Sequence, residues 1–180
     1  MTGRGAPDRP ALVLMGTAAA GKTAIGSAVA AALGVRFVEG DDFHPPANVA
    51  RMAAGIPLTD ADREGWLQAL AGELRTARLD GRGIVMSCSA LRRIYRDVLR
   101  GGDDGVQFVF LHAGIDVLRD RLAARRGHFM PVSLLESQFA TLEPPAADER
   151  AWHLDASRSR EELTRAILSR LGASAPEARP

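Results

Sequence analysis

Short apolar runs alternate along the chain with longer stretches in which an apolar residue recurs every three or four positions. The short runs predict buried strands at residues 11–15, 35–38, 84–88, 106–111 and 152–154. The periodic stretches predict helices that bury one face, at about residues 22–33, 46–54, 59–74, 91–100, 116–126 and 132–142, with a last one after Ser159. Such alternation of strand and helix is typical of a parallel sheet covered on both faces.

This pattern predicts one α/β domain of three layers, with loose tails at about residues 1–10 and 172–180. In parallel sheets of this kind, ligands bind beyond the carboxyl ends of the strands. The segments that follow the first four strands, at residues 16–23, 39–44, 88–93 and 112–114, are therefore expected along one rim. A site assembled from these loops is the first place to look for chemistry.

The segment after the first strand matches the phosphate-binding pattern G-x-x-x-x-G-K-[ST]. Its glycines allow the backbone N–H groups to converge on a phosphate chain, and the following helix adds the positive end of its dipole. We therefore expect a P-loop NTPase fold that binds ATP and Mg²⁺, with Lys22 acting in catalysis and Thr23 holding the metal. The expected nucleotide-binding residues are Gly16, Thr17, Ala18, Ala19, Ala20, Gly21, Lys22 and Thr23. The loop lacks a third glycine and is expected to be stiffer than usual.

A turn with three carboxylates follows the second strand, at Glu39, Asp41 and Asp42. A carboxylate there faces the transferring phosphoryl group and can accept a proton or hold Mg²⁺. If the extended backbone continues through Gly40, Glu39 and Asp41 point to the same side and Asp42 points away. We therefore predict that Glu39 contributes to the metal site and that Asp41 is the base, with Asp42 solvated or capping a helix. His44 is equally consistent with a substrate contact and with simple packing in the turn.

Arginines are concentrated in the stretch from residue 116 to 126. Arg121 and Arg125 are four residues apart and so share a helical face, where they can neutralise charge on a phosphoryl donor. A basic helix exposed to solvent is the alternative. The breaker at residues 127–131 favours a lid over about residues 125–142, with Arg121 at the nucleotide and Arg125 in catalysis.

Other features narrow the class of function. No Asp follows the third strand and no N-K-x-D signature is present, which favours transfer to a bound hydroxyl over hydrolysis and disfavours a GTPase. The net charge of +1 over 180 residues argues against nucleic-acid binding. Cys88 is the only cysteine, so no internal disulfide is possible and a reducing compartment is favoured. No apolar run reaches the length of a membrane span and no export signal is visible, so we expect a cytoplasmic protein.

Several longer blocks carry a resemblance to a known family. They are Asp42-Phe-His-Pro45, Pro57-Leu-Thr-Asp-Ala-Asp-Arg63, Cys88-Ser-Ala-Leu91 and Gly127-His-Phe-Met130, with Leu134-Leu-x-Ser-Gln138 and Leu142-Glu-x-Pro145. With the phosphate loop they span residues 12 to 150, and the chain resembles the small P-loop gluconokinases, which are similar in build to shikimate and adenylate kinases. In three places the chain departs from that pattern: Ala19 replaces a glycine, Glu39 stands where Asp is common, and Gly65 replaces a proline.

The resemblance implies ATP-dependent phosphorylation of D-gluconate to 6-phospho-D-gluconate with Mg²⁺, feeding the pentose phosphate pathway, in a protein that is often a homodimer. It also implies that Asp41, His44, Arg63, Arg92 and His128 contact the substrate. Two alternatives remain open: a kinase for another small hydroxy acid such as shikimate, and a nucleotide-binding regulator without transfer activity. The presence of Lys22, Thr23 and Asp41 favours the enzyme.

Overall fold

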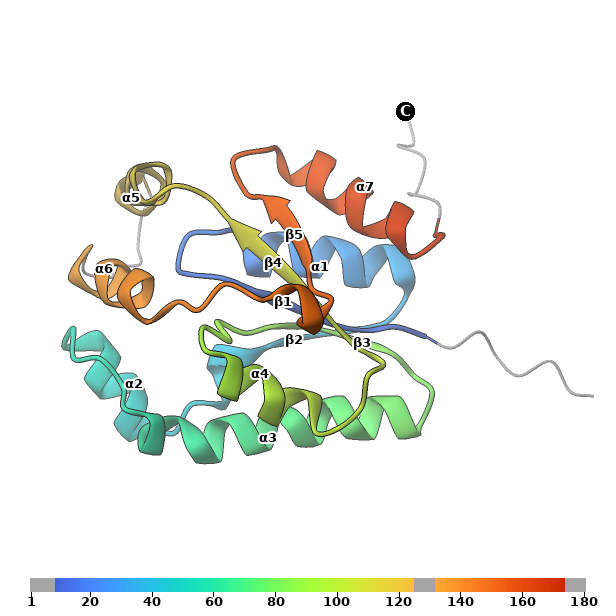
Figure 1. Cartoon of the computed structure of the whole chain (residues 1–180), viewed down its shortest axis with the longest axis horizontal. Coiled ribbons are helices and arrows are strands. Elements are labelled where there is room, and N and C mark those ends of the chain that lie inside the picture. The colour runs from blue at the N-terminus through green and yellow to red at the C-terminus, as the bar shows by residue number, and fades with distance from the viewer. Residues whose placement is uncertain (1–8, 125–131, 174–180) are drawn as a thin grey trace, which may run out of the picture.

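All five apolar runs form strands of one parallel sheet in the computed structural model, which describes residues 9–124 and 132–173. The strand order is β2-β3-β1-β4-β5 (Figure 1). The strands are β1 (Ala11–Met15), β2 (Arg36–Glu39), β3 (Ile84–Ser87), β4 (Val106–His112) and β5 (Trp152–Asp155). Each lies within one or two residues of its predicted position, because continuous apolar runs are the signal of strands buried on both faces.

The helices also follow the predicted pattern. They are α1 (Lys22–Leu33), α2 (Pro46–Ala53), α3 (Asp60–Leu79), α4 (Arg93–Arg100), α5 (Ile115–Ala124), α6 (Val132–Thr141) and α7 (Arg160–Arg170). Two short 3₁₀ turns, η1 (Gly40–Phe43) and η2 (Ala147–Glu149), were not predicted. Of the predicted lid, residues 132–141 form α6 and residues 125–131 lie outside the described part of the chain.

Helices cover both faces of the sheet, as expected (Figure 1). Alternate residues of β1 point to opposite faces, so Leu12 and Leu14 pack in the core under α1 and α7, whereas Val13 and Met15 pack under α3 and α4. All four of these side chains are completely buried. The sheet is therefore a rigid platform. Helices α2, α5 and α6 gather at one end of it, toward which the strands direct their carboxyl ends (Figure 1).

Local signals fix the ends of several helices. Gly34 ends α1 in the left-handed conformation, with φ at 62°. At the start of α3, the Thr59 hydroxyl accepts a bond from the Asp62 N–H at 3.2 Å, and the Asp62 carboxylate accepts one from the Thr59 N–H at 2.8 Å. Ser159 and Glu162 form the same reciprocal cap on α7. In the described part of the chain, the helices are too short or too polar to cross a membrane.

Candidate active site

The phosphate loop joins β1 to α1 with a backbone that requires glycine at two places. Gly16 has a φ of 141°, and a Cβ there would lie 2.4 Å from the Leu111 carbonyl oxygen. Gly21 has a φ of 92° and forms the N-cap of α1. Because the first N–H groups of a helix have no partner within it, the start of α1 is suited to bind an anion. The loop thus has the geometry that its sequence pattern predicts.

Ala19 adopts a left-handed backbone conformation without being a glycine. Its φ is 62°. For a residue with a Cβ, this conformation costs roughly 1–2 kcal/mol. The side chains of Thr17, Ala18, Ala19 and Ala20 are buried, so the surrounding core holds the loop in this shape. The departure from glycine has therefore kept the turn and added strain to it.

Two contacts involve polar groups of the loop that are expected to face phosphate. The Lys22 ammonium donates to the Thr17 carbonyl oxygen at 2.9 Å, so this side chain folds back along the loop. The Ala18 N–H donates to the Oε1 atom of Gln138, on α6, at 2.6 Å. A side chain from α6 therefore meets the loop directly.

Glu39, at the end of β2, links the start of α1 to β3. Its carboxylate accepts a bond from the Thr23 hydroxyl at 2.6 Å and another from the Ser87 hydroxyl. Glu39 and Ser87 are direct neighbours in the β2–β3 register. Carboxylate and hydroxyl oxygens beside a phosphate loop suit Mg²⁺, which prefers hard oxygen ligands and takes one or two carboxylates with phosphate and water. Groups of three or more His, Cys, Asp or Glu placed for metal binding do not occur among the described residues, which is compatible with that preference.

The acidic turn after Glu39 is not extended, so the condition under which Glu39 and Asp41 were expected to point to the same side is not met. The strand ends at Glu39 and residues Gly40–Phe43 form a 3₁₀ turn. The backbone of Gly40 lies so close to β3 that a Cβ would be 2.3 Å from the Ser87 carbonyl oxygen, which explains why glycine stands at this position. The side-chain alternation used to separate Asp41 from Asp42 was therefore wrong, although Asp41 lines the cavity described next and Asp42 is not among its lining residues.

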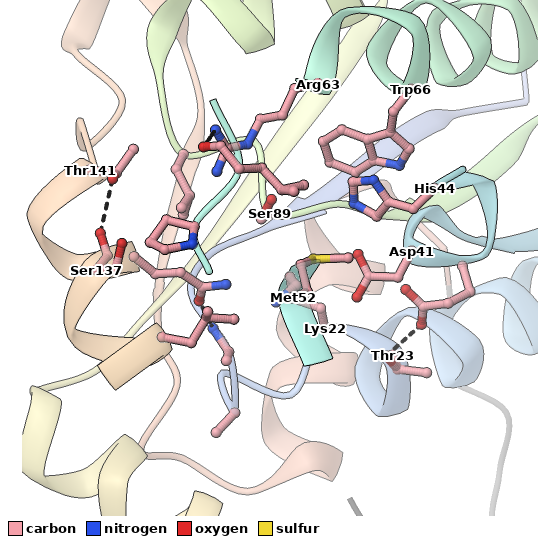
Figure 2. A pocket seen from close by; sticks show the side chains of 18 of the residues that line it. Lys22, Thr23, Asp41, His44, Met52, Arg63, Trp66, Ser89, Ser137 and Thr141 are labelled. Carbon is pink, nitrogen blue, oxygen red and sulfur yellow. Dashed lines mark hydrogen bonds between the residues drawn. The ribbon is translucent and has the colours of Figure 1, made fainter. Parts of the chain in front are cut away.

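A cavity of about 150 Å³ opens between the phosphate loop, the acidic turn and α6. Figure 2 shows its two walls, with Asp41, His44 and Trp66 on one side and Ser137 and Thr141 on the other. Lys22 lies between the two walls (Figure 2). The lining also includes Ala18, Ala19, Gly21, Thr23, Glu39, Met52, Pro57, Leu58, Arg63, Ser89, Leu91, Leu134 and Gln138. Residues predicted to bind the nucleotide and residues predicted to bind the acceptor thus line the same cavity.

His44 both packs in the turn and faces this cavity. Its ring stacks on Trp66 with centroids 4.1 Å apart, and the indole N–H of Trp66 donates to the Gly40 carbonyl oxygen at 2.7 Å. Burial lowers the pKa of His44 below its usual value of 6.5, against the opposing effect of the Asp41 carboxylate. The ring is therefore neutral at pH 7 and presents one donor and one acceptor.

The two arginines predicted to contact the substrate occupy different places. Arg63 lines the cavity, and its Nη1 donates to the Leu58 carbonyl oxygen at 2.6 Å and to the Tyr95 hydroxyl at 3.3 Å. Arg92 forms ion pairs with Asp60 and Glu143 and is not one of the described lining residues. The Tyr95 hydroxyl in turn donates to Asp60. Arg92 is therefore outside the described lining and is connected to Arg63 through Asp60 and Tyr95.

The remaining arginines and the second histidine predicted to act at the site are not among the described residues that line the cavity. Arg121 is on α5 and does not belong to the described lining. Arg125 and His128 lie outside the described residues.

Sequence reasoning missed the wall contributed by α6. Leu134, Ser137, Gln138 and Thr141 are spaced i, i+3, i+4 and i+7, which is one helical face, and all four line the cavity. A face that mixes one leucine with three polar side chains is the signal that could have identified this wall. Ser87 was also missed as a partner of Glu39, because only the strand order reveals that the two are adjacent.

Comparisons with known proteins agree with this geometry. A family model described as shikimate kinase matches residues 18–171. A gluconokinase from Gluconobacter oxydans is 51% identical over 138 residues, which cover 77% of this chain and 78% of that protein. The crystal structure of a gluconokinase from Sinorhizobium meliloti superposes with a TM-score of 0.82 at 44% identity, covering 91% of this chain and 94% of that one. An unliganded sugar kinase from Janibacter superposes with a TM-score of 0.87 at 42% identity, covering 96% and 99% of the two chains.

Proposed function

This chain belongs to the gluconokinase family of P-loop kinases, and we propose on that basis that it transfers the γ-phosphoryl group of ATP to D-gluconate, forming 6-phospho-D-gluconate and ADP. The observation that carries the proposal is the shared cavity, in which the phosphate loop faces Asp41, His44 and Arg63. A phosphoryl donor held by the loop and an acceptor held by the opposite residues would then be in contact. A nucleotide-binding regulator would not need a carboxylate and an arginine at this place.

The residues of the site have different roles in the transfer. The loop N–H groups and Lys22 bind the phosphates and stabilise the charge that develops on them during transfer. The acceptor hydroxyl oxygen forms a bond to the γ-phosphorus as the bond from that phosphorus to the β–γ bridging oxygen breaks. The proton of the hydroxyl passes to the Asp41 carboxylate, which therefore acts as general base. ADP leaves with the electron pair of the broken bond.

Thr23 and Glu39 are suited to hold Mg²⁺ through their oxygens, directly or through water. The ion supplies charge neutralisation at the phosphates when it is bound. Asp41 also lines the cavity beside them, so its carboxylate serves the acceptor while Glu39 serves the metal.

Substrate recognition follows from charge and hydrogen bonding. Gluconate carries one carboxylate and a row of hydroxyls. Arg63 is the cation in the described cavity wall opposite the loop, and its guanidinium is suited to pair with the carboxylate. Neutral His44, with Ser137 across the cavity, supplies hydrogen-bond partners for the hydroxyl groups of gluconate. Arg92 contributes by holding Asp60 and Tyr95, which in turn position Arg63.

The remaining parts of the proposal rest on the sequence. Arg121, on α5, is assigned to the nucleotide. On the predicted lid, Arg125 is assigned to the transferring phosphoryl group and His128 to the substrate. A homodimer is proposed from the family resemblance, and size-exclusion chromatography with light scattering would test it. A cytoplasmic location is proposed because the one cysteine, Cys88, is typical of a reducing compartment.

Transfer to shikimate is the second candidate, favoured by the shikimate kinase family model that matches residues 18–171. A coupled assay of ADP release, run with gluconate, with shikimate and with no acceptor, separates the possibilities. We expect release that depends on gluconate. Release that depends on shikimate alone would replace the proposed substrate, and nucleotide binding without release would favour a regulator.

A further inference from the structure

The side chain of Asn48 lies between the ring of His44 and the start of α3. Asn48 belongs to the first turn of α2, and it is only 4% exposed. Its Nδ2 atom donates to the Asp62 carbonyl oxygen, in the first turn of α3, at 2.7 Å. The same nitrogen lies 3.5 Å from the Nδ1 atom of His44. One buried amide therefore meets both the helix and the ring.

The contact with Asp62 fixes which end of the amide faces the ring. A carbonyl oxygen can only accept, so an amide turned the other way would set its own oxygen against that of Asp62. The nitrogen therefore occupies this position. It carries two hydrogens, and Asp62 uses one of them, which leaves the second for Nδ1 of His44. Pro45 and Pro46, which directly follow His44, have no N–H to offer to the ring.

This contact distinguishes the two neutral forms of the imidazole. A neutral ring carries its hydrogen on one nitrogen and a lone pair on the other, and the partner of one nitrogen decides which form is present. A hydrogen on Nδ1 would face the NH₂ group of Asn48, donor against donor. A lone pair on Nδ1 faces a donor instead. The hydrogen bond is long at 3.5 Å, so avoiding the clash of two donors counts as much as the attraction. The contact therefore favours the form with its hydrogen on Nε2.

The other edge of the ring is the one available to the cavity. Trp66 stacks on the ring with centroids 4.1 Å apart and planes 16° apart, which fixes the plane of the imidazole. The Nδ1 edge is turned toward buried Asn48, yet His44 lines the cavity. The outer edge, which carries Nε2, is thus the part left to face that space. Figure 2 shows the ring between Trp66 and Asp41. This wall of the cavity therefore offers an N–H donor beside a carboxylate.

We propose that Asn48 is a positioning residue that keeps His44 a hydrogen-bond donor toward the phosphoryl acceptor. A hydroxyl that gives its proton to the Asp41 carboxylate has only lone pairs left for a second neighbour, so that neighbour must donate. The Nε2–H group of His44 meets this requirement, whereas a lone pair on Nε2 would not. The form of the ring follows from the contacts of Asn48 alone. Its use in binding gluconate rests on the proposed function.

The first test is the long-range ¹H–¹⁵N spectrum of the imidazole groups in the ¹⁵N-labelled full chain, which distinguishes a protonated ring nitrogen from an unprotonated one. The chain has four histidines, and His44→Gln identifies the signals of His44. At alkaline pH, where the ring is neutral, the wild type should carry the hydrogen on Nε2. In Asn48→Asp the new carboxylate accepts from Nδ1–H, so the hydrogen should move to Nδ1. A wild type with its hydrogen on Nδ1, or a folded Asn48→Asp that keeps it on Nε2, overturns the proposal. If Asn48→Asp does not fold, the spectrum of the wild type still decides the form of the ring.

The second test is the pH profile of the KM for gluconate. In the wild type Nε2 carries a hydrogen in the neutral and in the charged ring, so this bond survives the loss of the charge. In Asn48→Asp it exists only in the charged ring. The KM of the variant should therefore equal that of the wild type in acid and exceed it by about three- to tenfold in alkali, the equivalent of one net hydrogen bond. The KM for ATP should not change.

A matched control separates the donor from the added charge. Asp41 of η1 and Arg63 of α3 are the charged side chains that act on His44, and they are the same in both proteins. Val49→Asp places the same charge at the next position of α2, which is exposed and outside the described lining. Its KM ratio to the wild type should stay constant with pH. A constant ratio for Asn48→Asp, or an equal rise for Val49→Asp, overturns the role of the donor. If the wild type does not phosphorylate gluconate, the proposed function fails, whereas the spectra still decide the form of the ring.

Discussion

At the residue scale, the departure of Ala19 from glycine has a measurable consequence for stability. Its φ of 62° is costly for a residue with a Cβ, whereas glycine adopts it freely. Ala19→Gly should relieve that strain, partly offset by the greater freedom of glycine in the unfolded chain, for a net stabilisation of about 0.5 kcal/mol. Urea denaturation measures it. The control is Ala31→Gly, at an exposed position of helix α1, which should destabilise the protein by about 1 kcal/mol. If Ala19→Gly destabilised the protein as much as Ala31→Gly does, the backbone of Ala19 would not be strained.

The neighbouring aspartates should differ in their effect on catalysis. Asp41 lines the cavity and Asp42 is exposed outside it, so Asp41→Asn should lower kcat by about 10²–10⁴-fold and leave ATP binding nearly unchanged. Asp42→Asn, the matched control, should have a mild effect. Steady-state kinetics with both substrates decides the matter. If Asp42→Asn were the more damaging change, the base would have to be reassigned.

Substitutions of Arg63 and of Arg92 should have different effects on the KM for gluconate in the same kinetic assay. Arg63 lines the cavity, so Arg63→Met should raise the KM for gluconate by roughly 10–100-fold, the range of a lost charge-assisted hydrogen bond, with little change in the KM for ATP. Arg92→Met should have a smaller effect, because Arg92 reaches Arg63 only through Asp60 and Tyr95. Equal increases in the KM of both substrates for Arg63→Met would place this arginine outside the acceptor site.

The places of residues that belong to contiguous motifs could be predicted from the sequence. Lys22 and Thr23 belong to a contiguous pattern, and the structure places both beside the cavity. Ser87 and Gln138 could not be predicted in the same way. Their partners, Glu39 and Ala18, lie 48 and 120 residues away in the chain, and only the packing of the elements brings them together.

At the scale of elements, the strands and helices were predictable because burial and capping leave strong local signals. The 3₁₀ turn of Gly40–Phe43 was not, because the close approach of the Gly40 backbone to β3 is a tertiary contact that the residues of the turn do not reveal on their own. The conformational propensities of the residues in the turn do not indicate that contact.

The link between α4 and η2 should matter for stability. Arg96 and Glu149 form an ion pair in which both side chains are almost fully buried, exposed by 1% and 2%, with Nη2 and Oε1 2.8 Å apart. Removing one partner of a buried pair costs about 3–5 kcal/mol, and a glutamine that keeps one hydrogen bond should cost somewhat less. We therefore expect Glu149→Gln to lower the melting temperature clearly at pH 7. Asp148→Asn, which breaks the adjacent exposed pair with Arg93, is the control and should cost little.

The difference in melting temperature between the wild type and Glu149→Gln should depend on pH. Hydrogen bonds from Arg96 lower the pKa of Glu149 below its usual value of 4.5. The carboxylate therefore contributes its full stability above pH 4.5 and loses it as the pH falls through the lower pKa of the folded state. Melting curves from pH 7 downward should show the gap between the two proteins closing in acid. A gap that stays constant into that range would show that the charge of Glu149 is not what stabilises the pair.

At the scale of the whole molecule, the strand order assembles the site. Because β3 lies between β2 and β1, the carboxyl ends of these three strands are adjacent, and the phosphate loop, Glu39 and Ser87 meet there. Helix α6 closes the other side of the same cavity. The rim itself was predictable from the rule for parallel sheets, whereas the facing wall required the three-dimensional arrangement. Donor and acceptor groups therefore share one space although they come from distant parts of the chain.

We propose that this chain phosphorylates gluconate with ATP at the phosphate loop. The direct test is gluconate-dependent formation of ADP and 6-phosphogluconate by the purified wild type and by Lys22→Ala, with circular dichroism to verify that both are folded. Lys22 lines the cavity and is proposed to stabilise phosphate charge, so its loss should cost about 3–4 kcal/mol in the transition state and lower kcat about 10²–10³-fold. Robust turnover by the wild type and near-absence of turnover in a folded Lys22→Ala is the expected result. A folded Lys22→Ala that phosphorylates gluconate at the rate of the wild type would contradict the account.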